Sequence, residues 1–260
     1  MRPPRIVAAV LAAAALLAGC ATTAPRAPTN PQADPWEGFN RSVFAFNDAV
    51  DEALLAPVAT AYRDFVPSLV RTGIANVFGN IDDAWSAIHH FLQGKPASGL
   101  DMTMRVAVNS SFGLFGLLDP ATELRLERRP EDFGQTLAVW GAGPGPYLVL
   151  PLLGPSTVRD TLAKPLDMLP SPSLMTDRES ARNGLRVLGI VDTRARLLAT
   201  TDLLGQAALD RYSFARDAYL ARRLDQVHDG APPLDDPDDA ADTPPARTST
   251  PAPAASAARR

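Results

Sequence analysis

The sequence predicts an all-α fold, and two features of its patterning favour that class. Apolar residues recur at intervals of three or four in several segments, which places them along one face of a helix. Alternating polar and apolar residues, the pattern of a half-buried strand, never continue long enough to suggest a sheet. A composition of 46% hydrophobic and 21% charged residues is ordinary for globular proteins, so the chain is expected to bury a core.

Residues 1–19 have the pattern of a secretory signal peptide. Arg2 and Arg5 precede an apolar run over residues 6–18, and small residues stand before Cys20. The run is too short to span a bilayer, which takes roughly 20 apolar residues. We therefore expect this segment to be removed during secretion.

Cys20 is the single cysteine, which excludes an intrachain disulfide. Residues 17–20 (LAGC) resemble the lipobox of bacterial lipoproteins, in which cleavage leaves an acylated cysteine as the new N-terminus. Several acyl chains hold a protein firmly on a membrane, so Cys20 is the expected lipidation site. Ala21 at the next position resembles the sorting pattern of outer-membrane rather than inner-membrane lipoproteins.

Two segments of biased composition flank the region that is expected to fold. Residues 20–33 contain three prolines and no periodic apolar pattern, so they are predicted to form an extended, lipidated tether. Residues 231–260 are rich in Asp, Pro and Ala, a composition typical of a disordered tail. The folded domain is therefore expected over residues 34–230, and it contains no internal repeat.

Helix signals begin at the start of this domain. Asp34 can cap a helix, Pro35 suits the first helical position, and Glu37 can complete a capping box. The apolar stripe of this first helix consists of Trp36, Phe39, Val43, Phe46, Val50 and Leu54. Further helices are expected over residues 68–78, 82–92, 96–108, 130–140, 177–199, 202–209 and 212–227.

Residues 133–158 form a stretch of 26 residues without one formal charge. Five glycines and four prolines in this stretch make a continuous membrane-spanning helix implausible. The stretch fits a re-entrant or cavity-lining hairpin, because irregular backbone survives at membrane depth only on protein or beside water. It fits a buried apolar loop of a soluble core equally well, and the lipid anchor favours the membrane.

Several function classes are disfavoured. A net charge of −4 supplies no basic surface for nucleic acid. The motifs G-x-S-x-G, H-E-x-x-H and G-x-x-x-x-G-K-[ST] are absent, and adjacent His89 and His90 point about 100° apart on a helix, so they cannot share a metal. The acidic pairs at 82–83 and 131–132 are explained by capping of helix starts, and Ser156 has no histidine nearby in sequence. We expect neither an enzyme nor a cofactor.

A set of residues distributed over the whole domain carries a family resemblance. They are residues 34–41 (DPWEGFNR), Phe46, Asn47, Asn76, Asn80, residues 91–94, Asn109, Ser110, Gly113, Gly116, Asp119, residues 133–137, Trp140, Gly141, residues 145–147, Pro151, Gly154, Arg159, Asp160, Tyr212, Arg216, Tyr219 and Arg222. Together they resemble the MlaA (VacJ) family of outer-membrane phospholipid-transport lipoproteins. Arg211 and His89 depart from residues that are common in the family, which leaves the assignment intact.

The resemblance implies a ring-like helical domain in the inner leaflet of the outer membrane, with a central amphipathic channel. Members remove misplaced phospholipids from the outer leaflet and pass them to a soluble periplasmic lipid carrier, and they associate with trimeric porins. The implied location of this chain is the periplasmic face of the outer membrane, and the implied activity maintains lipid asymmetry without covalent chemistry.

The uncharged hairpin is well suited to line or gate such a channel. The expected lipid path consists of Tyr147, Leu148, Leu150 and Leu152 on the hairpin, with Asn40, Asn47, Gln93 and Arg159 as its polar lining. Helix capping and hydrogen bonds between helices explain each of the four polar residues equally well.

Two other functions agree with an anchored helical domain. A periplasm-facing scaffold for envelope or porin assembly would need no long uncharged hairpin and would form a closed bundle. A lipid-hydrolysing enzyme would need a serine hydrogen-bonded to a histidine in a cleft.

Overall fold

The computed structural model describes residues 34–170 and 176–232. The predicted signal peptide (1–19), Cys20 with the tether (20–33), and the tail from residue 233 onward lie outside the described residues.

Helices dominate the described chain, which confirms the predicted mainly α-helical class. The helical elements are α2 (Glu37–Val50), the π-helical turn η1 (Asp51–Leu55), α3 (Ala56–Phe65), α4 (Ser68–Leu92), α5 (Pro96–Ser111), α6 (Pro120–Glu123), α7 (Phe133–Val139), α8 (Val158–Asp167), α9 (Glu179–Ala207) and α10 (Arg211–Val227). Two short strands, β1 (Tyr147–Leu150) and β2 (Gly154–Thr157), separate α7 from α8.

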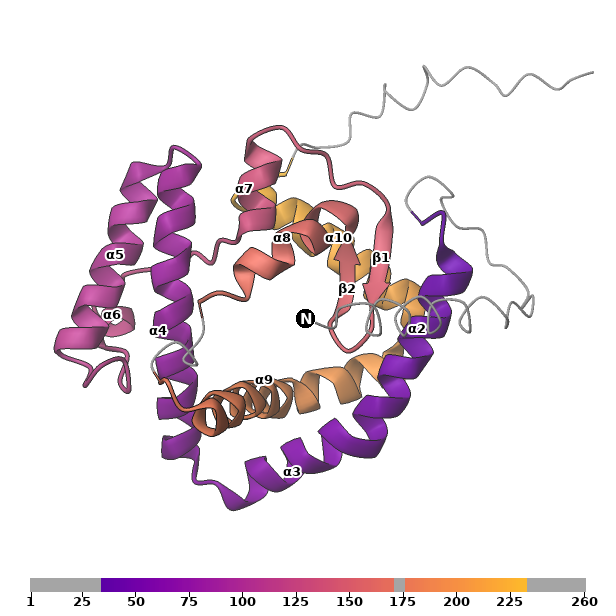
Figure 1. Ribbon diagram of the computed structural model, residues 1–260, viewed down its shortest axis with the longest axis horizontal. Helices are drawn as coiled ribbons and strands as arrows, with labels where there is room; N and C mark the ends of the chain where they lie inside the picture. The colour runs from indigo at the N-terminus through magenta and orange to yellow at the C-terminus, as the bar shows by residue number, and fades with distance from the viewer. Residues whose placement is uncertain (1–33, 171–175, 233–260) are drawn as a thin grey trace, which may run out of the picture.

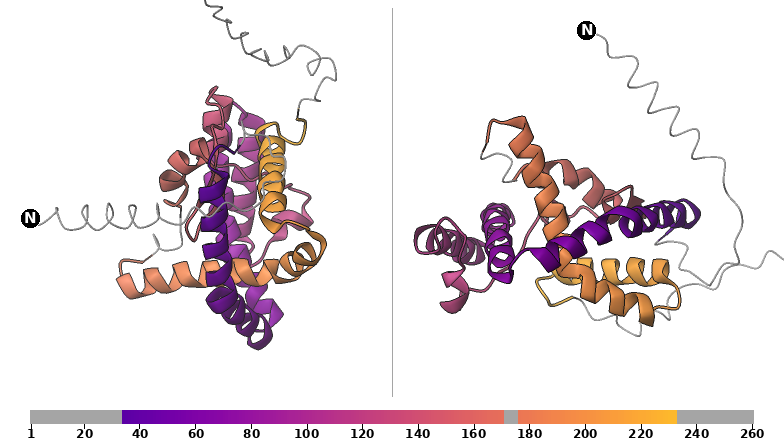
Figure 2. Two further views of the ribbon diagram at one scale, coloured as in Figure 1. Left: turned by 90° about the vertical axis from the view of Figure 1, so that its right-hand side faces the viewer. Right: turned by 90° about the horizontal axis from the view of Figure 1, so that it is seen from below.

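The elements are arranged as a ring (Figure 1). The helix α4 forms one side, α7 and α8 the next, the β-hairpin and α2 the third, and α9 closes the ring on the inner side of α3. The views in Figure 2 show that α9 runs across α2 and α4 instead of parallel to them. The contact between α3 and α9 contains an apolar cluster of Ala59, Ala195 and Leu198 and a hydrogen bond from the Tyr62 hydroxyl to Asp192 (3.0 Å).

The first helix begins later than the sequence predicts. Trp36 stands at the N-cap position without a side-chain cap, and Glu37 binds Arg41 one turn on (2.8 Å) instead of completing a capping box. Asp34 does not cap this helix. Its buried carboxylate accepts hydrogen bonds from Asn40 Nδ2 (2.8 Å) and from the Tyr212 hydroxyl, so it joins the start of the domain to α10.

Two predicted helix breaks are wrong. Residues 68–78 and 82–92 belong to one 25-residue helix, α4, and residues 177–199 and 202–209 belong to α9. In α4 the weak helix formers at the expected break are held by the tertiary structure. Gly79 lies against the Arg128 guanidinium, and Asn80 Nδ2 donates to Ser110 Oγ of α5 at 3.1 Å. Packing therefore outweighs local propensity there.

The β-hairpin within residues 133–158 is a second departure, because no sheet is expected from the sequence. Its strands are antiparallel, with Tyr147 opposite Thr157 and Leu150 opposite Gly154. Tyr147 and Val149 are fully buried in the cluster around Val43, whereas the two leucines between and after them are half-buried. Strands of four residues are too short for an alternating pattern to stand out.

The buried part of the described chain is unusually polar. Polar and charged residues outnumber hydrophobic ones among the buried side chains, and many large apolar side chains are exposed. Within residues 34–170 and 176–232, none of the helices combines the length and the apolar character needed to cross a bilayer.

Candidate functional site

The inner side of α4 defines one wall of the ring. Phe78, Trp85 and His89 share a helix face, since they are separated by seven and four residues. Phe78 packs on Gly189 of α9, Trp85 Nε1 donates to Asp167 Oδ1 of α8 (3.2 Å), and His89 Nδ1 is 2.8 Å from Thr136 Oγ1 of α7. The opposite side of α4 packs on α5, so this face points into the ring.

Asp82 lies on that inner face, between Phe78 and Trp85. It is in the middle of α4, so the expected cap of a helix start at residues 82–83 is wrong. The adjacent Asp83 points to α5, where its carboxylate is buried between Arg105 (3.3 Å) and Arg128 (2.9 Å). The Asp82 side chain is accessible to solvent. The protein around it nevertheless reduces the hydration of its carboxylate, which raises the pKa of Asp82 to about 6.

The helix α8 supplies an apolar wall. Its residues Asp160 and Ala163 are buried against α7 and α10. Leu162 and Leu166 on this helix, and Leu169 just beyond its end, are 72%, 40% and 53% exposed. In Figure 1, α8 borders the open centre of the ring. The exposed leucines therefore give this part of the ring an apolar surface, while the inner face of α4 carries the Asp82 carboxylate between Phe78 and Trp85.

Two of the predicted polar lining residues hold the hairpin on α2. Asn40 Nδ2 donates to the carbonyl of Tyr147 (3.1 Å), and its Oδ1 accepts from the Val149 amide (2.9 Å). One helical repeat later, Asn47 Nδ2 donates to the carbonyl of Leu150 (2.9 Å), and its Oδ1 accepts from the Leu152 amide (2.8 Å). Both asparagines bond backbone groups of the hairpin through donor and acceptor alike, which fixes the position of β1 on α2.

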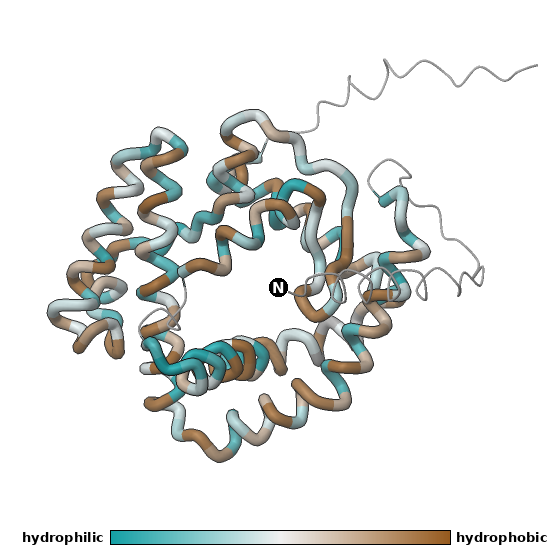
Figure 3. The backbone as a smooth tube through the Cα atoms, in the orientation of Figure 1, coloured by the Kyte–Doolittle hydropathy of each residue, from teal (hydrophilic) through white to brown (hydrophobic). Residues whose placement is uncertain are grey.

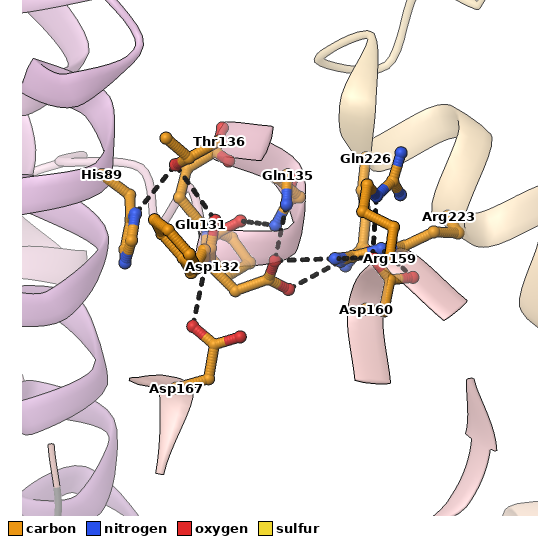
Figure 4. A network of polar contacts seen from close by, with 12 residues as sticks. His89, Glu131, Asp132, Gln135, Thr136, Arg159, Asp160, Asp167, Arg223 and Gln226 are labelled. Atoms are coloured by element: carbon orange, nitrogen blue, oxygen red, sulfur yellow. Dashed lines mark hydrogen bonds and ion pairs between the residues drawn. The ribbon is translucent and has the colours of Figure 1, made fainter. Parts of the chain in front are cut away.

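A buried ion network ties α10 to α7 and α8 (Figure 4). Arg223 binds Asp132 through two bonds (2.6 and 2.7 Å) and Asp160 through two more (3.0 and 2.9 Å). The hydrogen bonds and charge of Arg223 overcome the effect of burial and lower the pKa of Asp160 to about 2. Asp132 also caps α7 by accepting from the Gln135 amide (2.8 Å), which agrees with the cap expected at residues 131–132.

The remaining predicted polar residues belong to the same region. Gln93 Nε2 donates to Glu131 Oε2 (2.8 Å) and to Thr136 Oγ1 (3.2 Å). Arg159 is nearly buried, and its Nε donates to Asp160 Oδ1 at 3.0 Å. Burial lowers the pKa of His89, so its ring is neutral at pH 7.

The predicted hairpin residues differ in exposure. Tyr147 is fully buried, Leu148 and Leu150 are half-buried, and Leu152 at the turn is 66% exposed. Sequence analysis missed Leu162, Leu166 and Leu169, on and just after α8, although their spacing of four and three residues is the signal of a helical stripe.

The described residues offer little for hydrolysis. The Ser156 hydroxyl accepts from Thr161 Oγ1 (3.0 Å), and the hydroxyl paired with His89 belongs to Thr136, which is fully buried away from any substrate. In the part of the chain that the structure describes, no group of three or more His, Cys, Asp or Glu is placed to hold a metal ion.

Large apolar side chains are exposed at two corners of the ring. Phe65 and Leu69 at the α3–α4 corner are 86% and 85% exposed, and Phe112 and Phe115 between α5 and α6 are 77% and 87% exposed. Figure 3 shows apolar stretches of backbone along α3 and at the same end of α5. Exposed aromatic clusters of this kind mark surfaces that contact a membrane or another protein.

Comparison with known proteins agrees with this architecture. Residues 32–226 match the family model described as MlaA lipoprotein. The intermembrane phospholipid transport system lipoproteins MlaA of Shigella flexneri and Escherichia coli K12 are 38% and 37% identical to it, each over 80% of this chain and 82% of the relative. The corresponding protein of Haemophilus influenzae is 32% identical over 88% of this chain and 93% of its own length.

A solved structure that concerns the maintenance of bacterial outer-membrane lipid asymmetry is also similar. It has 38% sequence identity and a TM-score of 0.65, and the match covers 75% of this chain and 98% of the solved one. The family model spans most of the domain, the relatives match it over most of their length, and the fold is shared. The chain therefore belongs to the MlaA lipoprotein family.

Proposed function

We propose that this chain is an outer-membrane lipoprotein that removes misplaced phospholipids from the outer leaflet and passes them to a soluble periplasmic carrier, which maintains lipid asymmetry. Membership of a family whose relatives are named for intermembrane phospholipid transport supports the class of substrate. The observation that carries the mechanism is the two-sided ring wall, with Asp82 on α4 and exposed leucines on α8.

A phospholipid needs both kinds of wall. Each methylene of an acyl tail costs about 0.8 kcal/mol when it is exposed to water, whereas a head group must keep polar contacts. Leu162, Leu166 and Leu169 would cover the tails while the head group moves along the α4 side. Transfer of this kind needs no bond to be made or broken, so we propose a carrier and not an enzyme.

The exposed corners suit a ring that lies in the inner leaflet. Phe65 and Leu69 on one side, with Phe112 and Phe115 on the other, would bury their rings and chains among lipid tails. Acylation at Cys20 would add a second attachment, and we propose the periplasmic face of the outer membrane as the location. Trimeric porins and a periplasmic lipid carrier are the proposed protein partners.

The candidate residues of the lipid path take different parts in this proposal. Leu148, Leu150 and Leu152 of the hairpin are proposed to contact acyl tails, because they lie on its exposed side and at its turn. Asn40, Asn47, Gln93 and Arg159 are proposed to act mainly by holding the wall in place, and Tyr147 by anchoring the hairpin in the core.

A charge on the apolar wall tests the function. Leu166→Asp places a carboxylate beside the proposed acyl path, and we expect phospholipid to accumulate in the outer leaflet of cells that carry it. Leu166→Ala shortens the side chain without adding a charge, and it is expected to retain most of the transport. Helicity and protein level are measured in parallel. Normal lipid asymmetry with folded Leu166→Asp protein would exclude a path along α8, and a closed bundle without lipid would favour the scaffold.

A further inference from the structure

On the inner face of α4, Asp82 lies between two residues that contact other helices. Below it Phe78 meets α9, and above it Trp85 meets α8. The residues that pack α4 against α5, such as Asp83, lie on the other side of the helix. The Asp82 carboxylate therefore lies on the side of α4 that faces the centre of the ring, between these two contacts.

The carboxylate has no hydrogen bond or ion pair within residues 34–170 and 176–232. The two cations near enough to affect its pKa are Arg128 and Arg196, and each is paired with another acid. Arg128 binds Asp83 at 2.9 Å, and Arg196 Nε is 3.2 Å from Asp192 Oδ2. Asp82 is thus the acid left over between two completed pairs.

The surroundings of Asp82 make an unpaired carboxylate energetically unfavourable there. Asp82 is exposed at the inner wall, but the protein around it reduces its hydration enough to raise the pKa to about 6. An exposed acid whose hydration is reduced gains more from pairing with a charged ligand than a fully hydrated acid does. At pH 7 the carboxylate is still mainly ionised.

We propose that Asp82 contacts the ammonium group of a zwitterionic phospholipid head group, of the phosphatidylethanolamine type, as the lipid moves through the ring. This inference rests on the transport function proposed above and adds head-group selection to it. Arg196, whose side chain is 53% exposed, supplies a cation near Asp82 for the phosphate of the same head group. An anionic head group without an amine would be repelled by Asp82.

The test uses the full-length lipoprotein in detergent, loaded from vesicles of equimolar phosphatidylethanolamine and phosphatidylglycerol. Bound lipids are identified by native mass spectrometry. We expect the wild type to be enriched in phosphatidylethanolamine, and Asp82→Asn to lose this enrichment by on the order of fivefold while binding as much total lipid. Asp82→Glu keeps the charge and is expected to retain the preference.

Asp101→Asn is the matched control, because Asp101 is an exposed acid on α5, outside the ring. It is expected to behave as the wild type. Asp82→Asn should unfold at the same temperature as the wild type or higher, since it removes an unpaired acid; a marked loss of stability would give Asp82 a structural role and overturn the inference. An unchanged ratio of bound phosphatidylethanolamine to phosphatidylglycerol in Asp82→Asn would also overturn the inference. In that case the lipid binding itself would leave the proposed transport function standing. Absence of any bound lipid in the wild type would overturn both.

Discussion

Replacement of Arg223 by alanine should destabilise the ring more than any surface change on the same helix. Arg223 makes four hydrogen bonds to two carboxylates that converge from α7 and α8, and its side chain is 10% exposed. Without it, Asp132 and Asp160 would share a largely buried site with no bidentate cation. Breaking a buried pair from one side costs about 3 to 5 kcal/mol.

The pKa of Asp160 gives an independent value for part of this loss. A fall from 3.8 to about 2 corresponds to roughly 2 to 3 kcal/mol of preference for the ionised form. Because the folded pKa lies below the unfolded one, this stability is present above about pH 4 and is lost as the pH falls through 2. In Arg223→Ala, protonation stabilises the unpaired acids instead. The difference in the free energy of unfolding between variant and wild type should therefore narrow as the pH falls from 5 towards 2.

The assay is the free energy of unfolding from denaturant titration in detergent, measured at several pH values. Arg222→Ala is the matched control, since Arg222 is the next residue of α10 and is exposed. We expect it to change the free energy of unfolding by less than about 0.5 kcal/mol. Two results would refute the conclusion that this network stabilises the ring. One is a loss in the free energy of unfolding below about 1 kcal/mol in Arg223→Ala, and the other is a difference from the wild type that does not depend on pH.

Three further predictions concern a glycine beside this network, the β-hairpin and the expected lipidation site. Gly134→Ala puts a methyl group against the buried ion network and should lower the free energy of unfolding by about 1 to 3 kcal/mol, whereas Gly184→Ala, in open space on α9, should leave it equal or raise it slightly; equal effects would contradict this reasoning. Asn47→Ala should cost about 1 to 2 kcal/mol and speed hydrogen exchange at the Leu152 amide, and unchanged exchange would show that the hairpin is held elsewhere. Cys20→Ser should block acylation and leave an uncleaved or mislocalised precursor; a mature, acylated protein in the outer-membrane fraction would exclude Cys20 as the lipidation site.

The sequence was informative where its signal is periodic. The stripe over α2 and η1, the start of α5 at Pro96 and the end of α10 at Val227 follow from helical spacing and flanking residues, whereas α3 was not predicted. The β-hairpin did not, because four-residue strands carry too little pattern. The joining of two predicted helices into α4 depends on contacts with Arg128 and Ser110, which are distant in sequence.

The type of candidate site could be predicted from the sequence, but the residues that line it could not. Motif residues such as Asn40 and Asn47 drew attention because they are polar and specific to the family resemblance, and in the structure their amides are occupied by the backbone of β1. An asparagine that pairs with a distant strand and one that meets a ligand look the same in sequence. Asp82 was explained by a cap, since the break assumed near residue 79 made it the start of a helix.

The distribution of polarity explains why these errors occurred together. A globular domain buries apolar side chains and exposes polar ones, so buried Asn, Arg and Asp are usually read as functional. In this chain the wall elements are joined by polar contacts, such as Arg223 with Asp160 and Asn40 with β1. That leaves leucines and phenylalanines free to face outward and into the ring. The proposed function gives this arrangement a physical reason: apolar side chains that contact acyl tails do not hold the helices together, so directional hydrogen bonds take a larger share of that role.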